Sequence, residues 1–159
     1  MGGFDMNIPG ESAEYRKARA ALLQAEANLR AEVENVAALR RALPEGAARA
    51  AAYSFQGVDG KNSALEDLFG GKPSLFIYSF MFEPAAGQGT CPMCCAFLDS
   101  FNGAAPHIAD RTAIAVIAKA SAKDLSELVE DRGWSNLPMY SSAGGSSNTD
   151  YNAESADGG

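Results

Sequence analysis

Three cysteines lie within five residues of this chain, in the segment Cys91-Pro92-Met93-Cys94-Cys95, and its 159 residues hold no others. Two cysteines separated by two residues can form and break a disulfide, because one helical turn separates them. The attacking species in thiol–disulfide exchange is the thiolate, which a free cysteine with a pKa of about 8.5 supplies sparingly at neutral pH. A helix N-terminus favours the thiolate through its unpaired backbone N–H groups and its dipole.

The flanking segments predict such a helix. Residues 74–82 are apolar on both faces, as in a central parallel strand, and the cysteines follow them. Pro92 suits a first helical turn, and apolar residues then recur at helical spacing at Ala96, Phe97, Leu98 and Phe101. We therefore expect Cys91 to attack a substrate disulfide and Cys94 to resolve the mixed disulfide. Asn102-Gly103 and Pro106 are expected to end or kink the helix.

Cys95 has two interpretations. It lies about 100° around the helix from Cys94, which favours a small buried apolar side chain against the sheet. The second interpretation is an auxiliary resolving thiol. The carboxylates nearest the motif, Glu83 and Asp99, are expected to be solvated surface groups, with proton relay to Cys94 as the alternative. Trp134 is expected to pack over the sheet edge, with a contact to the substrate as the alternative.

Structural zinc is the main alternative for the motif, with an inert pair of core cysteines as another. Zinc normally takes four ligands, and no second cysteine pair occurs in the sequence. His107 is the only histidine, and a continuous helix would hold it about 20 Å from Cys91. The same distance argues against His107 as a general base. We expect no metal site, and thiol exchange requires no organic cofactor.

Composition restricts the class of protein. The net charge of −7 and the scattered basic residues argue against a nucleic-acid partner. No apolar run approaches the roughly 20 residues that span a bilayer, and the first nine residues lack signal-peptide features. We expect a cytoplasmic protein with no membrane partner. In that compartment, clustered cysteines are more often catalytic or metal-binding than structural.

The chain divides into three predicted parts. Residues 11–43 read as one helix, begun by Ser12 or Glu11, with an apolar heptad stripe at Tyr15, Leu22, Leu29, Val36 and Leu43. The stripe is expected to pack on the same chain or to form a dimeric coiled coil. After a linker at 45–52, residues 53–142 alternate strands and helices, which predicts an α/β domain with a largely parallel sheet. Residues 143–159 are rich in Ser, Gly and Asp and are expected to be a disordered tail.

Within the domain, further elements are expected in chain order. An edge strand at 53–57 and a turn at 59–61 precede a capping-box helix over 63–69. A buried strand at 112–118 leads to a helix that Ser121 caps and Gly133 closes, and a short strand follows at 137–140.

Several motifs resemble a bacterial thioredoxin-like family of unknown function whose members are labelled dithiol–disulfide oxidoreductases. The resemblance covers roughly residues 11–151 and is carried by the segments 14–23, 65–82, 91–94, 101–103, 106–107, 132–134 and 140–142. It implies a thioredoxin-like fold with Cys91 and Cys94 at the position of the redox pair. It supplies no substrate.

The chain departs from this family in two respects. Family members usually continue with further strands and a helix, whereas this sequence runs into the polar tail. We therefore expect a C-terminally shortened thioredoxin-like fold with an exposed sheet edge and an incomplete substrate groove, which a homodimer would complete. Cys95 is also additional to the motif. A peroxiredoxin is disfavoured, since its peroxide site requires a threonine three residues before the cysteine, where this chain has Gln88, with Thr90 adjoining Cys91.

The resulting hypothesis is a thioredoxin-like thiol–disulfide oxidoreductase that uses Cys91 and Cys94. Its expected partners are a protein or small-molecule disulfide or thiol and an external thiol reductant system. The alternative is a non-catalytic binding or dimerisation module with an inactive or incomplete site, in which the N-terminal helix is the working part.

Overall fold

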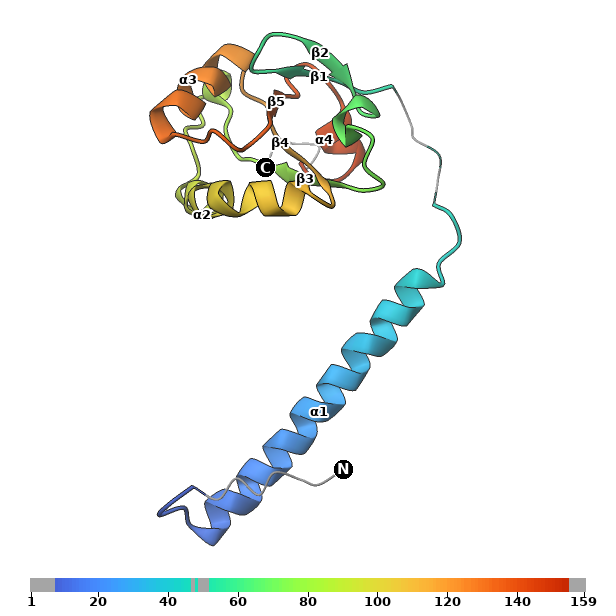
Figure 1. Ribbon diagram of the computed structural model, residues 1–159, viewed down its shortest axis with the longest axis vertical. Helices are drawn as coiled ribbons and strands as arrows, with labels where there is room; N and C mark the ends of the chain where they lie inside the picture. The colour runs from blue at the N-terminus through green and yellow to red at the C-terminus, as the bar shows by residue number, and fades with distance from the viewer. Residues whose placement is uncertain (1–7, 47, 49–51, 155–159) are drawn as a thin grey trace. The chain divides into compact units, whose positions relative to one another are not determined.

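The computed structural model describes residues 8–46, 48 and 52–154, and the chain separates into two units between residues 48 and 49 (Figure 1). Half of the predicted linker, residues 47 and 49–51, lies outside the described residues. None of the helices in the described ranges is long and apolar enough to cross a lipid bilayer.

The first unit contains the helix α1 (Ala13–Arg41), whose 29 residues confirm the predicted N-terminal helix. Ser12 caps it, because its hydroxyl accepts a hydrogen bond of 3.1 Å from the backbone N–H of Tyr15. Glu11 pairs with Arg19 at 2.8 Å. No described side chain of α1 is buried, and the apolar stripe at Tyr15, Leu22, Leu29 and Val36 is exposed. Both explanations for the stripe stay predictions.

The second unit is built on a five-stranded mixed sheet with the order β2-β1-β5-β4-β3. Strands β3, β4 and β5 run parallel, while β1 pairs antiparallel with both β2 and β5. Their bounds are β1 (Ser54–Gly57), β2 (Asn62–Ala64), β3 (Leu75–Ser79), β4 (Ala113–Ala118) and β5 (Met139–Ser141).

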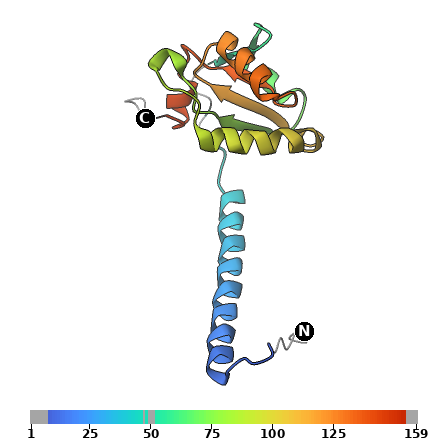
Figure 2. The ribbon, with the colours of Figure 1, turned by 90° about the vertical axis from the view of Figure 1, so that its left-hand side faces the viewer.

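The two longer helices of this unit, α2 (Pro92–Ala109) and α3 (Ala122–Arg132), pack on one face of the sheet (Figure 2). Alternate residues of β4 build two cores, since Ile114 and Val116 face the helices while Ala115 and Ile117 face the other way. The opposite face carries the 3₁₀ turns of η1 (Asp67–Phe69) and the short helix α4 (Ser147–Asp150). A further 3₁₀ turn, η2 (Pro84–Ala86), precedes the cysteines. This is the predicted α/β, thioredoxin-like architecture with a long helix before it.

Three predicted elements that precede the cysteines differ in the structure. The segment 74–82 forms β3, which ends the sheet instead of lying at its centre, because apolarity on both faces does not report on a strand's neighbours. The predicted edge strand β1 lies between β2 and β5. The predicted capping-box helix over 63–69 is replaced by β2 and η1, since the hairpin pairs Ser63 with Phe55.

Helix α2 runs through Asn102, Gly103 and Pro106 to Ala109. The prediction that the helix ends at these residues is therefore wrong. Pro106 has no N–H to bond the carbonyl of Asn102 four residues earlier. The side-chain amide of Asn136 donates to that carbonyl at 3.1 Å, and the Asn136 backbone N–H donates to the Asn102 side chain at 2.9 Å. A contact with the loop after α3 therefore satisfies the group that the proline leaves free.

The described part of the predicted tail, residues 143–154, contacts the domain. The hydroxyl of Tyr53 donates to Asp150 at 2.9 Å, and the Tyr53 and Tyr151 rings lie 5.6 Å apart. Glu154 pairs with Lys119 at 2.7 Å. These contacts join residues far apart in sequence, which composition does not reveal. Residues 155–159 lie outside the described residues, and the division of the chain at residue 142 stays a prediction.

Candidate functional site

Cys91 is the N-cap residue of α2, and Pro92 occupies the first helical position. The Cys91 backbone is extended, with φ −70° and ψ 121°. Its N–H donates to the Met81 carbonyl at 3.2 Å, and its carbonyl accepts from the Cys95 N–H at 3.0 Å. The first contact holds Cys91 beside Met81, which lies two residues beyond the end of β3. The second contact begins the helix. Cys91 is thus held at the positive end of the helix dipole.

The first turn of α2 holds the pKa of the Cys91 thiol below its ordinary value. The largest effect comes from the backbone N–H of Cys94 and the next from the Cys94 thiol, with a smaller one from the Met93 N–H, while partial burial acts in the opposite direction. Cys91 is half-buried, and solvent reaches it. The arrangement therefore favours an accessible thiolate.

Cys94 lies one helical turn after Cys91 and is buried, with 8% of its surface exposed. Burial is the main cause that raises the pKa of Tyr78 on β3 to about 12, followed by the interaction of its hydroxyl with the Cys94 sulfur and then by the charges of the nearby thiols. Tyr78 therefore stays protonated at neutral pH and acts as a donor.

Tyr78 is a site residue that the sequence interpretation missed. Its ring stacks on Phe97 of α2 at 4.7 Å, which fixes the hydroxyl beside the cysteine helix. The sequence feature that points to Tyr78 is the two-residue period of the strand, which puts Phe76, Tyr78 and Phe80 on one face. That period does not specify which of the three reaches the cysteines.

Cys95 is buried at 5% exposure within the apolar core that also contains Leu98 and Leu125. This environment matches the interpretation as a small core side chain, and the role of auxiliary resolving thiol stays a prediction. All three cysteines are free thiols.

The two carboxylates near the motif are engaged elsewhere. Glu83 pairs with Lys119 at 3.1 Å. Asp99 accepts a hydrogen bond of 2.8 Å from the indole N–H of Trp134 and lies 3.4 Å from Arg132. Trp134 is buried at 1% exposure and packs edge-on against Phe80, so it belongs to the core and not to the sheet edge. Asp99 thus anchors the end of α3 to α2.

His107 lies in the last turn of α2, sixteen residues from Cys91 along an unbroken helix. The structure does not bring the two side chains together, as a rise of 1.5 Å per residue separates them by more than about 20 Å. Within the described ranges, no group of three or more His, Cys, Asp or Glu side chains is arranged to hold a metal ion.

An α/β thioredoxin-like domain with two neighbouring cysteines in the first turn of a helix is the class of protein that this fold and site define. Residues 6–159 match the model of a family described as "Bacterial protein of unknown function (DUF899)". The chain belongs to this family. No curated protein and no solved structure gives a significant match to it.

Proposed function

We propose that the protein is a thiol–disulfide oxidoreductase in which Cys91 is the nucleophile and Cys94 the resolving thiol. The supporting observation is the position of Cys91 at the N-cap of α2, where the N–H groups of Cys94 and Met93 and the Cys94 thiol lower the pKa of the Cys91 thiol. This position stabilises negative charge on a cysteine that solvent can reach.

The reaction proceeds in two exchanges. The Cys91 thiolate attacks one sulfur of a substrate disulfide, and a bond from Cys91 to that sulfur replaces the substrate S–S bond. The departing substrate thiolate takes up a proton. Cys94 then loses its proton and attacks the Cys91 sulfur, which releases the second substrate thiol and leaves a Cys91–Cys94 disulfide. Two electrons have passed to the substrate, and an external dithiol restores the reduced protein.

Tyr78 is the positioning residue for the second exchange. Cys94 must become a thiolate in a buried environment, which raises the free energy of the charged form. The Tyr78 hydroxyl donates a hydrogen bond to this sulfur and offsets part of that cost. The substrate that fits is a protein or small-molecule disulfide.

The test uses oxidised glutathione and insulin as disulfide substrates and dithiothreitol as the reductant. We expect Cys91→Ser to reduce turnover at least about a hundredfold, since the nucleophile is lost. Cys94→Ser should accumulate a mixed disulfide on Cys91 that mass spectrometry detects, and Cys95→Ala is the matched control that keeps turnover. The proposal fails if Cys91→Ser keeps full activity.

A reduction potential adds an independent check. Catalytic pairs of this kind titrate between about −120 and −270 mV. If the Cys91/Cys94 pair could not be oxidised within this range and the pKa of Cys91 were ordinary, the non-catalytic alternative would be favoured.

That alternative is a dimerisation module formed by α1, and a specific observation favours it. The heptad residues Leu22 and Leu29 are 58% and 66% exposed, and a single helix in water gains little stability from its own hydrogen bonds. We expect the double variant Leu22→Glu, Leu29→Glu to sediment as a monomer if the stripe pairs with a second copy. Ala27→Glu, outside the stripe on the same helix, is the control that keeps the native size.

A further inference from the structure

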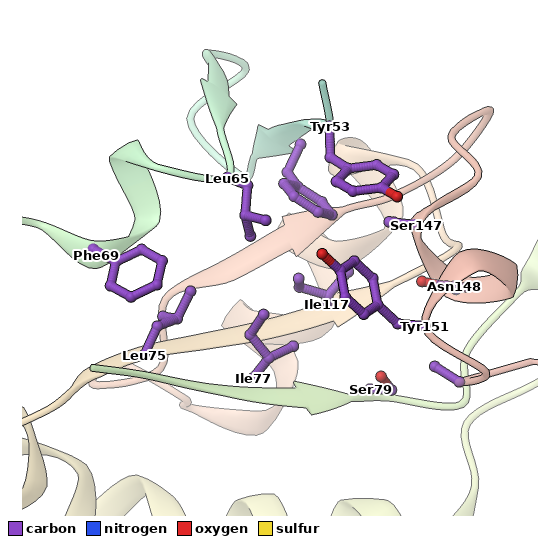
Figure 3. A pocket seen from close by; sticks show the side chains of 12 residues that line it. Tyr53, Leu65, Phe69, Leu75, Ile77, Ser79, Ile117, Ser147, Asn148 and Tyr151 are labelled. Carbon is purple, nitrogen blue, oxygen red and sulfur yellow. The ribbon is translucent and has the colours of Figure 1, made fainter. Parts of the chain in front are cut away.

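A groove of about 390 Å³ lies between the first half of α2 and the last turns of α3. Thr90 and Pro92, the two chain neighbours of the nucleophilic cysteine, line it, and Asp99, Asp131 and Arg132 contribute its charged groups. Seven residues, about 10 Å of helix, separate Pro92 from Asp99. The proposed nucleophile therefore lies beside a charged groove of the size of a small molecule. The apolar hollow on the opposite face of the sheet is a separate feature (Figure 3).

Arg132 is held in this groove by two contacts that leave most of its donors unused. The centre of its guanidinium lies 5.5 Å from the centre of the Trp134 ring, and Nη2 lies 3.4 Å from Oδ2 of Asp99. Asp99 is itself fixed by the indole N–H of Trp134 at 2.8 Å. The Arg132 side chain makes no further hydrogen bond or ion pair with the described residues. Because a guanidinium carries five N–H donors in a planar fork, Arg132 can still bind a carboxylate through two of them.

Asp131 supplies an unpaired opposite charge. It precedes Arg132 in the last turn of α3, and its carboxylate has no hydrogen-bond or ion-pair partner among the described residues. A ligand with only negative charge is repelled by the two carboxylates of the groove, and a ligand with only positive charge is repelled by the guanidinium. A ligand with one group of each sign pairs with both Arg132 and Asp131.

We propose that this groove binds the α-carboxylate and α-ammonium groups of an amino-acid disulfide, of which cystine is the simplest, with Arg132 on the carboxylate and Asp131 on the ammonium. This assignment rests on the proposed function, because it gives the Cys91/Cys94 pair a substrate class.

The exchange then balances as follows for cystine. The Cys91 thiolate attacks one sulfur, the cystine S–S bond breaks, and one cysteine leaves as a thiolate that takes up a proton. Cys94 loses its proton and displaces the second cysteine. Two electrons thus reduce one cystine to two cysteines, the Cys91/Cys94 pair becomes a disulfide, and the external dithiol restores it.

The test compares four disulfides as oxidants of the reduced full chain, with the rate constant measured by acid quench and mass spectrometry. L-cystine carries both charged groups, cystamine only the ammonium groups, 3,3′-dithiodipropionate only the carboxylates, and 2-hydroxyethyl disulfide neither. Each rate is divided by that of the same disulfide with dithiothreitol, which corrects for intrinsic reactivity. We expect L-cystine to exceed the other three at least about fivefold.

Two variants assign the charged groups. Arg132→Gln should slow oxidation by L-cystine and 3,3′-dithiodipropionate at least about fivefold but not by cystamine, whereas Asp131→Asn should slow L-cystine and cystamine but not 3,3′-dithiodipropionate. Lys123→Gln and Glu130→Gln, on α3 but outside the groove lining, are the matched controls that react as the unchanged chain does. The neutral disulfide reports general damage in each variant. If Arg132→Gln does not fold, Asp131→Asn and the four disulfides on the unchanged chain decide.

The outcomes distinguish a failure of this inference from a failure of the proposed function. If 2-hydroxyethyl disulfide oxidises the Cys91/Cys94 pair while L-cystine has no advantage and neither variant changes the order, the groove assignment is overturned and the redox function stands. If none of the four disulfides oxidises the pair, the redox function fails.

Binding alone then tests the groove. S-methyl-L-cysteine carries both charged groups and cannot exchange. It should change the fluorescence of Trp134, the single tryptophan of the chain, saturably in the unchanged chain and not in Arg132→Gln. Absence of this change would overturn the groove assignment as well.

Discussion

The hydroxyl of Tyr78 interacts with the sulfur of Cys94, and the Cys94 thiol in turn lowers the pKa of Cys91. Tyr78 and Cys94 thus link the edge strand β3 to the first turn of α2. A phenol whose pKa is about 12 remains a donor over the range in which thiols titrate. We therefore expect the reduction potential of the cysteine pair to depend on Tyr78, which lies outside the motif.

Removal of the Tyr78 hydroxyl should make the cysteine pair more reducing. In Tyr78→Phe the ring can still stack on Phe97, but the reduced form loses a hydrogen bond to Cys94. Such a bond contributes about 0.5–1.5 kcal/mol, and 30 mV corresponds to about 1.4 kcal/mol for two electrons. We expect the potential to fall by about 10–30 mV in a glutathione titration. Tyr140→Phe is the control, and an equal shift there would contradict the assignment.

The reactivity of Cys91 should follow a depressed pKa. The hydrogen bonds from the first turn lower the pKa of the thiol, so its thiolate fraction rises at lower pH than in a free cysteine. We expect the midpoint of iodoacetamide alkylation, followed by mass spectrometry, to lie below that of the same chain in guanidinium. By linkage, this interaction contributes stability above the unfolded-state pKa, and the contribution is lost as pH falls through the folded-state pKa. Identical midpoints would refute the effect.

Cys95 should matter for stability and not for exchange. Cys95→Ala removes one buried sulfur from the core and should lower the free energy of unfolding by about 1 kcal/mol. Cys95→Ser should cost more, about 1–3 kcal/mol, because it buries a hydroxyl without an assured partner. Chemical denaturation measures both. A loss of turnover in Cys95→Ala comparable to that of Cys94→Ala would instead show a resolving role.

Asp99 should contribute to stability through the indole of Trp134. Asp99→Ala leaves the buried indole N–H without its acceptor at 2.8 Å, and we expect a loss of about 1–3 kcal/mol with a shift in tryptophan fluorescence. Asp99→Asn keeps a carbonyl acceptor and should cost less. Asp131→Ala, a nearby acidic residue of α3, is the control. If Cys91 alkylation slowed in Asp99→Asn without loss of stability, a proton-relay role would replace this account.

Local patterns predicted a large part of the fold. Apolar spacing gave the helix that follows the cysteines, the strand β4 and the helix that Ser121 caps. Pro92 and its neighbours placed Cys91 at a helix N-terminus. These features depend on residues within one or two turns of each other.

What the sequence did not predict depends on long-range pairing. The edge position of β3 follows from which strands pair, and the ordering of α4 from Tyr53 reaching Asp150. Tyr78 became a site residue because β3 packs under α2, a relationship that no local period specifies. Such contacts join residues separated by up to 97 positions.

The proline within α2 ties this helix to a loop that is distant in the sequence. Because Pro106 cannot bond the Asn102 carbonyl, the side chain of Asn136, 34 residues away, completes that hydrogen bond. The loop after α3 thus supports the second half of the helix whose first turn carries Cys91 and Cys94. A change at Asn136 would therefore reach the proposed redox helix from its far end, without any contact to the cysteines.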